Sequence, residues 1–293
     1  MEILVQQIVA GLATGGIYAS LALALVMIYQ ATELVNFAQG EMAMFSTYIA
    51  WSLMNVGLPY WAAFFLTIAI SLAGGILIQR GIIRLFEKAP ILSVVIVFIG
   101  LLLIFQSTAG WIFTYLIKPF PSPFPQAAVT LGTVQFGSHD LGALGVTIVV
   151  LVLLYVFFRY TSLGLAMRAA AQNPVSSRLV GIRVGWMLAL GWGLAAAVGA
   201  VAGMMVAHKV FLDPLMMGGI LLYAFAAALF GGITSPGGAV VGGLTVGVLE
   251  NLVGAFVPFV GHELKLTVAL VLIIGVLLIK PSGLFGKAVV TRV

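Results

Sequence analysis

Few residues of this 293-residue chain carry groups that catalysis or binding needs, and they gather in short segments. One segment runs from Glu33 to Glu41 and adds the amides of Asn36 and Gln39 to two carboxylates. It separates two long apolar runs, so its polar groups fall at or near membrane depth if those runs cross a bilayer. Broken backbone at that depth must line water or be covered by protein. We therefore predict that Asn36, Gln39 and Glu41 line a solute pathway. A plain hairpin just outside the hydrocarbon is the alternative.

A second break is built from residues that disfavour helix. Gly231, Gly232 and Pro236 interrupt an apolar stretch, and the hydroxyls of Thr234 and Ser235 can bond the freed backbone groups. This composition is typical of a discontinuous element beside a transport pathway. We predict that these glycines and hydroxyl residues belong to a gate.

The most deeply placed charge is Glu250, inside the apolar run that follows this break. An ionisable group at membrane depth is a functional candidate by default. We favour a structural hydrogen bond over substrate contact, because such groups usually pair internally, and we keep Glu250 in the predicted pathway set.

A basic segment between residues 160 and 183 has the pattern of two short helices. Asn173 is a good N-cap, Pro174 suits the first helical position, and Gly181 can adopt the left-handed conformation that ends a helix. A helix over 174–180 is too short to be stable alone, so we expect it to rest on another surface. The segment has no acidic residue and carries three arginines that suit an acidic partner: Arg168, Arg178 and Arg183. A loop whose charge only sets topology is the alternative.

The residues that enzymes and metal sites need are missing. The chain has no cysteine, and His139, His208 and His262 stand far apart without metal-ligand spacing. No nucleophile elbow, paired catalytic carboxylates or zinc-protease motif occurs. We predict no catalytic residue, no metal and no cofactor. The net charge of +5 does not indicate a nucleic-acid partner, because in such a chain the distribution of charge matters more than its sum.

The elements that position these segments are membrane helices. Hydrophobic residues make up 62% of the chain and charged residues 7%, and the mean hydropathy is +1.22. A soluble domain carries roughly 25% charged residues, so only a lipid bilayer suits this surface. Long continuous apolar runs indicate helices rather than barrel strands. We predict an all-α polytopic membrane protein with eight or nine crossings, near 5–29, 38–56, 61–79, 91–117, 141–158, 187–207, 219–233, 239–256 and 265–279.

Two of these runs, 219–233 and 239–256, are marginal in length, and we predict that they are half-helices meeting at a break. The basic residues alternate between the gaps. One set of gaps holds ten of them: Arg80, Arg84, Lys88, Arg159, Arg168, Arg178, Arg183, Lys280, Lys287 and Arg292. The other set holds only Lys118, Lys209 and Lys265. The positive-inside rule then predicts nine crossings, with the N-terminus outside and the C-terminus inside. A count of eight requires a re-entrant segment.

Two further patterns predict local structure. The outer loop 118–140 begins with prolines and becomes β-like over Val129–Phe136. Glycines fall four residues apart at 11 and 15, 199 and 203, 238 and 242, and 243 and 247, which we interpret as close helix packing in lipid. We expect a single transmembrane domain over residues 1–293.

Six segments together resemble the permease subunits of ABC importers for branched-chain amino acids, the LivH type. They occur in the family's order and span nearly the whole chain: Gly16–Leu23, Val35–Glu41, Ser162–Ala169, Gly181–Ile182, Phe230–Ala239 and Lys280–Gly286. One departure is Gln39, where many relatives are expected to have His.

The resemblance implies an ABC importer permease fold in the inner (plasma) membrane. It also implies partners: a second homologous permease, two cytoplasmic ATPases and a periplasmic substrate-binding protein. It maps the ATPase-docking region onto 161–182, within a coupling region of about 159–186, and adds Ile182 to the coupling residues and Phe37 to the pathway residues. The implied function is ATP-driven import of branched-chain or other apolar amino acids by alternating access, with ATP hydrolysis on separate chains.

Other functions stay open at this point. Related permeases carry urea, short amides or small organic acids, and a mostly apolar path fits these solutes equally well. An ion-coupled secondary transporter usually holds ionisable groups at mid-membrane, where only Glu250 is a clear candidate. A membrane-embedded enzyme needs a catalytic constellation that the sequence lacks.

Overall fold

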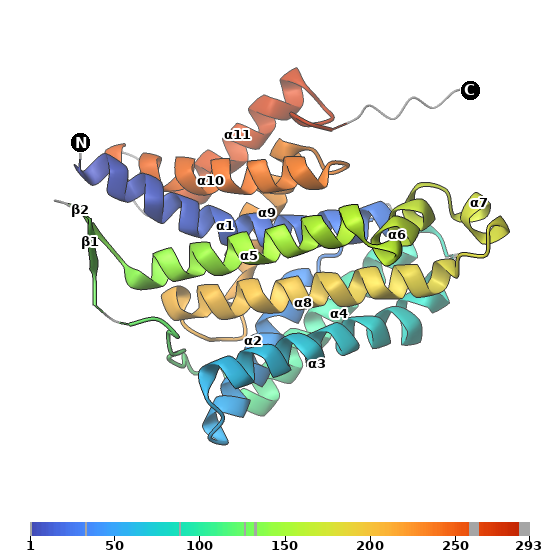
Figure 1. Cartoon of the computed structure of the whole chain (residues 1–293), viewed down its shortest axis with the longest axis horizontal. Coiled ribbons are helices and arrows are strands. Elements are labelled where there is room, and N and C mark those ends of the chain that lie inside the picture. Colours follow the sequence, from blue (N-terminus) through green and yellow to red (C-terminus); the bar gives the residue numbers. More distant parts are fainter. Residues whose placement is uncertain are drawn as a thin grey trace. The chain divides into compact units, whose positions relative to one another are not determined.

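The computed structural model of the protein describes residues 2–32, 34–87, 89–125, 127–131, 134–257 and 264–286. Among the residues named above, Glu33, Lys88, His262, Lys287 and Arg292 lie outside these ranges. The described chain is mainly helical, as predicted (Figure 1).

Each of the nine predicted apolar runs coincides with a helix. These are α1 (Glu2–Thr32), α2 (Gln39–Asn55), α3 (Tyr60–Gly81), α4 (Ile91–Phe113), α5 (Ser138–Tyr160), α8 (Val184–Val210), α9 (Met217–Gly231), α10 (Pro236–Phe256) and α11 (Lys265–Ile279). Shorter helices are η1 (Ile83–Phe86), α6 (Ser162–Gln172) and α7 (Pro174–Leu179). Within the described residues, six helices are long and apolar enough to cross a membrane by themselves: α1, α3, α4, α5, α8 and α10. The number of crossings and their orientation stay predictions.

The length of α10 differs from the prediction of a half-helix. It begins at Pro236 and has 21 residues, enough for a full crossing. Pro236 stands in the first turn, where its missing N–H has no helical partner to lose. The Ser235 hydroxyl accepts a hydrogen bond from the Gly238 N–H at 3.1 Å and caps the helix. The cap therefore starts α10 earlier than the apolar run itself suggests.

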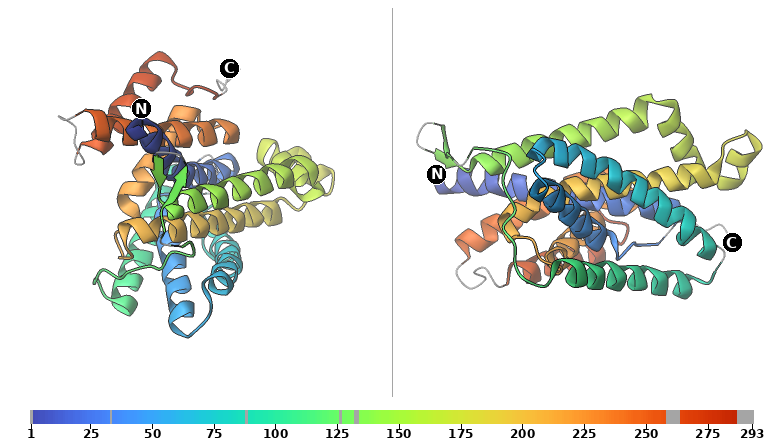
Figure 2. Two further views of the ribbon diagram at one scale, coloured as in Figure 1. Left: turned by 60° about the vertical axis from the view of Figure 1, so that its left-hand side comes forward. Right: turned by 90° about the horizontal axis from the view of Figure 1, so that it is seen from below.

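The described chain divides into two compact units. Unit 1 comprises Met1–Val26, Phe124–Val146 and Gly219–Val293, and unit 2 comprises Met27–Pro123 and Thr147–Gly218. In unit 2, α8 is the central helix and packs most extensively against α3 and then α2 (Figures 1 and 2). Its many alanines and glycines leave room for neighbouring backbones, which is how helices associate in lipid.

Contacts along α8 show in which direction the neighbouring helices α2 and α3 run. Gln39 lies against Ala195 and Thr47 lies against Gly203, so α2 runs parallel to α8. The last turn of α3 lies at the beginning of α8, where Arg80 covers the Trp186 ring, so α3 runs antiparallel to α8. The predicted topology requires both of these relations.

In unit 1, α1 and α10 approach each other through glycines. A Cβ atom on Gly15 would lie 2.8 Å from the carbonyl oxygen of Gly243, and one on Gly247 would lie 2.2 Å from the Cα of Gly15. Gly231 of α9 and Gly238 of α10 make an equally close contact. A larger residue at any of these positions would collide with backbone, so the packing interpretation is confirmed for the spaced glycines of unit 1.

Small non-helical contacts occur in two predicted outer gaps. β1 (Val129–Leu131) and β2 (Val134–Phe136) pair as antiparallel strands before α5, in the segment predicted to be β-like (Figure 2). In unit 2, Lys118 and Leu212 form an isolated antiparallel bridge through two hydrogen bonds of 2.9 Å. The chain leaves α4 at Phe113, earlier than predicted, on its way to this bridge.

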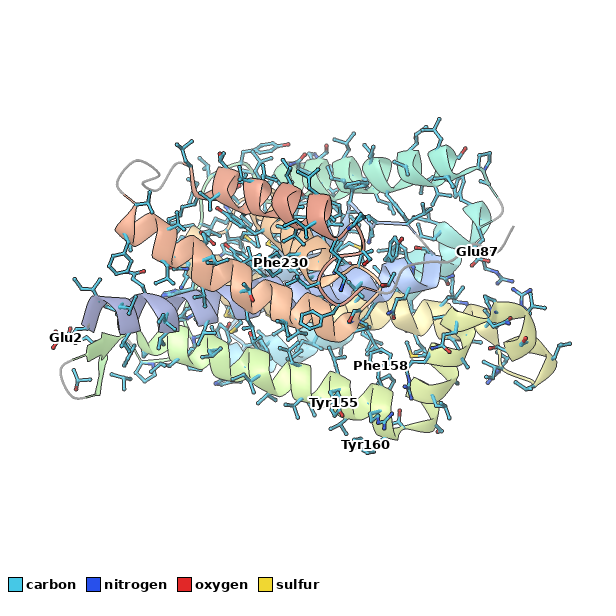
Figure 3. The ribbon with its side chains drawn as sticks, turned by 90° about the horizontal axis from the view of Figure 1, so that it is seen from above. Glu2, Glu87, Tyr155, Phe158, Tyr160 and Phe230 are labelled. Atoms are coloured by element: carbon cyan, nitrogen blue, oxygen red, sulfur yellow. The ribbon has the colours of Figure 1, made fainter. Side chains whose placement is uncertain are left out.

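α4 and α5 bury few of their side chains and present apolar surface. Tyr155 and Tyr160, near the end of α5, are exposed and meet edge to face with ring centroids 6.4 Å apart. Figure 3 shows both rings projecting outward from α5. Exposed aromatic residues at the end of a span are typical of a membrane interface.

Candidate functional site

The break between α1 and α2 holds a buried polar cluster in unit 2. Asn36, Gln39 and Glu41 are almost completely buried although all three are polar. The Asn36 side-chain oxygen accepts a hydrogen bond from the Ala38 N–H at 3.0 Å and forms the turn into α2. Glu41 stands in the first turn of α2, where the helix dipole favours a carboxylate. Phe37 differs from the other predicted members because 40% of its surface is exposed.

The contact of Gln39 with α8 shows how deep this cluster lies along the membrane span. The Gln39 side-chain amide donates a hydrogen bond to the Ala195 carbonyl oxygen at 2.9 Å and fills the space beside Gly199. Ala195 lies about 17 Å from the start of α8 and about 22 Å from its end, at 1.5 Å per residue. The polar break therefore lies near the middle of a candidate membrane span, whereas a plain hairpin outside the hydrocarbon would lie near its end.

Polar contacts continue along α2 beyond the cluster. The Ser71 hydroxyl of α3 donates a hydrogen bond to the Ser46 hydroxyl of α2 at 2.8 Å. Gln39 Oε1 and Glu41 Oε2 are buried without a hydrogen-bond partner among the described residues. Unpaired acceptors are costly in an apolar interior, so these two oxygens suit the N–H groups of a polar solute. Their predicted role in a pathway stays a prediction.

The predicted break in unit 1 lies between α9 and α10. Gly232 adopts a φ of +107°, and its carbonyl accepts a hydrogen bond from the Ser235 N–H at 2.8 Å, with Thr234 partly buried in the turn. The positive φ favours glycine, which explains Gly232. Gly231 has a different reason, because its Cβ would lie 1.9 Å from the Gly238 carbonyl oxygen. The structure thus assigns a conformational role to Gly232 and a packing role to Gly231, and the gate role of both stays a prediction.

Sequence reasoning missed what covers this break. The N–H groups of Leu284 and Phe285 donate hydrogen bonds of 2.9 Å to the last carbonyls of α9, those of Phe230 and Gly231. The Lys280–Gly286 segment therefore satisfies backbone groups that the broken helix frees. The proline and glycines of this segment indicate a local turn in the sequence, but they do not indicate that the segment contacts the end of α9.

The predicted hydrogen bond of Glu250 is confirmed. The Tyr18 hydroxyl of α1 donates a hydrogen bond to Glu250 Oε2 at 2.8 Å. The Tyr18 ring stacks on the Tyr223 ring at 4.9 Å between centroids. Because its carboxylate is engaged inside unit 1, Glu250 is less suited to ion coupling than an unpaired group would be.

The predicted short capped helix in the basic segment is confirmed as α7. The Asn173 side chain accepts a hydrogen bond from the Ser176 N–H at 2.9 Å, and Pro174 is the first helical residue. α7 ends at Leu179, and Gly181 then adopts a φ of +84°, the left-handed conformation expected of it. α6 and α7 together connect α5 to α8 (Figure 1).

The predicted coupling residues do not all lie together. Arg178, Ile182 and Arg183 line one cavity of about 290 Å³, but Arg168 does not. The Nε atom of Arg168 is buried without a partner among the described residues.

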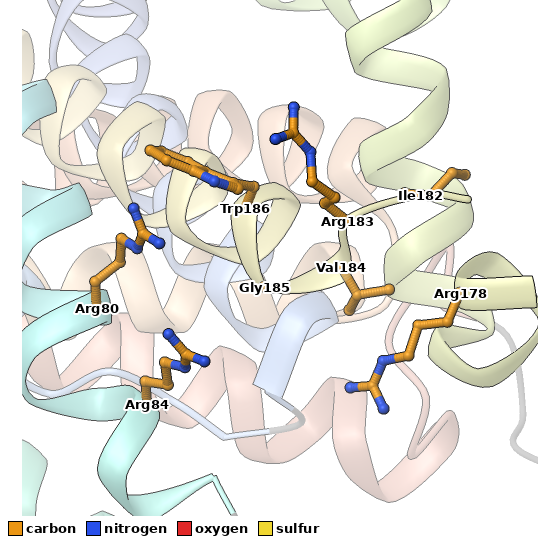
Figure 4. Close-up of a pocket in the computed structure, with 8 residues that line it drawn as sticks. All are labelled: Arg80, Arg84, Arg178, Ile182, Arg183, Val184, Gly185 and Trp186. Atoms are coloured by element: carbon orange, nitrogen blue, oxygen red, sulfur yellow. The ribbon is translucent and has the colours of Figure 1, made fainter.

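Two residues of this cavity were missed. Arg80 and Arg84 line it with the coupling residues (Figure 4), although sequence reasoning assigned them only to membrane topology. The available signal was that both basic gaps are predicted on the same side of the membrane, but sequence does not show that they meet.

Metal binding finds no support in the described ranges, where no three His, Asp or Glu side chains lie close enough to hold an ion. His208 lies with Nδ1 3.1 Å from the Phe120 carbonyl oxygen, and His139 packs against the Phe124 ring.

Residues 7–277 match a family model described as branched-chain amino acid transport system / permease component. The chain is similar to the high-affinity branched-chain amino acid transport system permease protein LivH of Escherichia coli K12, with 30% identity over 98% of this chain and 97% of the relative. It is 32% identical to BraD of Pseudomonas aeruginosa, described in the same words, over the same shares. A probable LivH of Methanocaldococcus jannaschii is 28% identical, over 91% and 87%.

A solved structure supports the fold independently. The chain resembles a chain of PsaBC from Streptococcus pneumoniae in complex with Fab, with a TM-score of 0.50 over 96% of this chain and 93% of that one. The sequence identity is 13%, so the likeness concerns the fold alone.

Proposed function

The chain belongs to the permease family of branched-chain amino acid transport systems, and on that basis we propose that it forms half of the membrane pathway of an ATP-driven importer. We assign branched-chain or other apolar amino acids as its solutes. The observation that carries this proposal is the family match over residues 7–277. The named relatives, whose descriptions state branched-chain amino acid transport, support the choice of solute.

The proposed pathway includes the polar break before α2 in unit 2. Its support is the burial of Asn36, Gln39 and Glu41 beside the middle of α8. Gly231, Gly232, Thr234 and Ser235 are the proposed gate residues of unit 1, because broken backbone at membrane depth accompanies transport sites. We propose that residues 1–293 act as one transmembrane domain in the inner membrane.

We propose that α7 and the residues around it couple this chain to cytoplasmic ATPases. The support is a two-turn helix with a firm N-cap and an exposed arginine, Arg178, followed by exposed Arg183. A rigid basic element of this kind can transmit motion from an acidic docking surface. A second permease and a periplasmic substrate-binding protein complete the proposed assembly.

Co-purification and transport test the proposal together. The tagged chain, extracted from its native host in a mild detergent, is expected to bring a second permease and an ATPase with it. The assembly in proteoliposomes, supplied with ATP and its binding protein, is expected to take up leucine in preference to urea or acetamide. Absence of any ATPase would contradict the importer assignment. Calorimetry that shows the binding protein to prefer urea or a short amide would contradict the solute assignment alone.

Charge reversal tests the coupling helix. The Arg178→Glu/Arg183→Glu variant is expected to lose uptake and ATPase stimulation while the binding protein still captures solute. Lys209→Glu, which reverses an exposed charge in the last turn of α8 and outside the coupling region, is the control and is expected to transport normally. Unchanged uptake in the double variant would remove α7 from the coupling path.

A further inference from the structure

Four arginines surround one cavity of about 290 Å³ in unit 2, although like charges repel. Arg80 is at the end of α3, Arg84 in η1, Arg178 in α7, and Arg183 just before α8. Figure 4 shows the guanidinium groups of Arg84 and Arg178 turned towards each other across the cavity, whereas that of Arg183 points away from them. Within the described ranges, no carboxylate forms an ion pair with any of the four.

The other walls of the cavity also favour an anion. Val184, Gly185 and Trp186 form the first turn of α8, and no side chain caps this helix. The positive end of a helix dipole adds to the attraction of the arginines. The Arg80 guanidinium lies 4.0 Å from the centre of the Trp186 ring, a cation–π contact that orients it at the cavity wall. One guanidinium group can donate two parallel hydrogen bonds to two oxygens of the same phosphate. The cavity therefore suits a phosphate-type anion.

The position of the cavity along the helices points to the source of that phosphate. One candidate span, Tyr60–Phe86, ends at the cavity, and another, Val184–Val210, begins there. The cavity therefore lies at the depth of lipid headgroups, where tryptophan and the tips of arginines concentrate. Leu85, beside the cavity in η1, is exposed and can contact an acyl chain. We propose that this cavity binds the phosphate group of an anionic phospholipid.

An acidic surface of a protein partner is the competing occupant. Two of the arginines lie within the candidate span Tyr60–Phe86, and this position favours the lipid because a docked protein would meet the exposed end of α7 first. Arg178 and Arg183 serve both proposals, so the lipid proposal is tested at Arg84, which stands outside the coupling region. It is therefore tested separately from transport and from ATPase coupling.

The test measures which lipids the full chain retains. The purified protein is reconstituted in nanodiscs of phosphatidylcholine with a minor share of phosphatidylglycerol, and native mass spectrometry counts the lipids that stay bound. The wild-type chain is expected to retain phosphatidylglycerol selectively. Arg84→Glu is expected to lower this retention at least about fivefold, the effect of one basic side chain near an anionic surface. Arg84→Lys, which keeps the charge without the paired donors, is expected to lower it less.

Arg159→Glu is the matched control, because it reverses one exposed arginine outside the cavity. If Arg84→Glu and Arg159→Glu lower the retention of phosphatidylglycerol equally, the lipid is held by general surface attraction, and the proposed site is overturned. Displacement of the lipid by inorganic phosphate alone would assign the cavity to free phosphate and also overturn the proposal. A wild-type chain that retains lipids without selectivity would overturn the proposal as well. If the Arg84→Glu variant of such a chain also fails to co-purify with the ATPase, the cavity binds an acidic protein surface instead. Thermal unfolding checks each variant, and Arg84→Gln replaces Arg84→Glu if the latter does not fold.

Discussion

Units 1 and 2 use the same glycine spacing to build different interfaces. In unit 1, glycine faces glycine, and a Cβ on Gly247 would lie 2.2 Å from the Cα of Gly15. In unit 2, glycine faces a polar side chain, and a Cβ on Gly199 would lie 2.6 Å from the Gln39 amide nitrogen. The first contact joins the backbones of α1 and α10, which cannot move aside to admit a side chain. The second creates room for a polar side chain near the middle of a membrane helix.

The difference shows that a spaced glycine pair has no single meaning. In unit 1 it serves stability, because close backbone packing is a main source of helix association in lipid. In unit 2 it holds a side chain whose Oε1 has no hydrogen-bond partner among the described residues, which stability alone does not explain. We therefore expect mutations in unit 1 to affect folding and those at Gln39 to affect transport.

The largest effect is expected from Gly247→Leu. The new side chain would meet the α1 backbone, which cannot move aside as a flexible side chain can, so little folded protein is expected. Yield of monodisperse protein in detergent measures this. Gly237→Leu is the control on the same helix, because a Cβ at Gly237 has no neighbour within 4 Å. Normal yield of Gly247→Leu would refute the α1–α10 contact.

Gln39→Met is expected to lose most solute uptake while the chain stays folded. The substitution removes one hydrogen bond, worth roughly 0.6 kcal/mol in membranes, and it also removes a buried unpaired oxygen. The melting temperature is therefore expected to stay the same or rise. Uptake by proteoliposomes and thermal unfolding are measured on the same preparation. Full uptake by Gln39→Met would contradict a role of Gln39 in the pathway and leave it a packing role only.

A moderate effect is expected from Gly199→Ala. The added methyl group would displace the Gln39 amide, and overpacking of this kind costs about 1–3 kcal/mol. The Gln39→Ala/Gly199→Ala double variant is expected to recover part of that loss, since the two residues share one space. Thermal unfolding of the wild type, the two single variants and the double variant gives the coupling free energy between residues 39 and 199. Gly191→Ala is the control on α8, with its nearest atom 3.7 Å away. Strict additivity would contradict the contact.

The smallest effect is expected from Tyr18→Phe. It removes the hydroxyl that donates to Glu250 but keeps a ring that can stack on Tyr223. A hydrogen bond to a charged group contributes about 1.5–3 kcal/mol in water-soluble proteins, and we expect less here because interhelical bonds in membranes contribute less. The melting temperature is expected to fall slightly with uptake retained. A large loss of uptake would instead indicate that Glu250 serves the pathway.

Local features of the sequence sufficed for much of the fold. The nine apolar runs predicted nine helices because hydrophobic length is a local property that the bilayer selects directly. The cap of α7 was predictable for the same reason, since Asn173, Pro174 and Gly181 each act on the backbone within a few residues. The start of α10 was missed because its cap lies outside the apolar run.

By itself, therefore, the sequence determined the membrane class, the helical runs, the family resemblance and the candidate polar segments. Only the tertiary structure decided their depth and their partners. It showed Gln39 beside the middle of α8, the Lys280–Gly286 segment on the last carbonyls of α9, and Arg84 across a cavity from Arg178. These contacts join residues far apart in the chain, and they depend on shape and close packing that neither hydropathy nor spacing records.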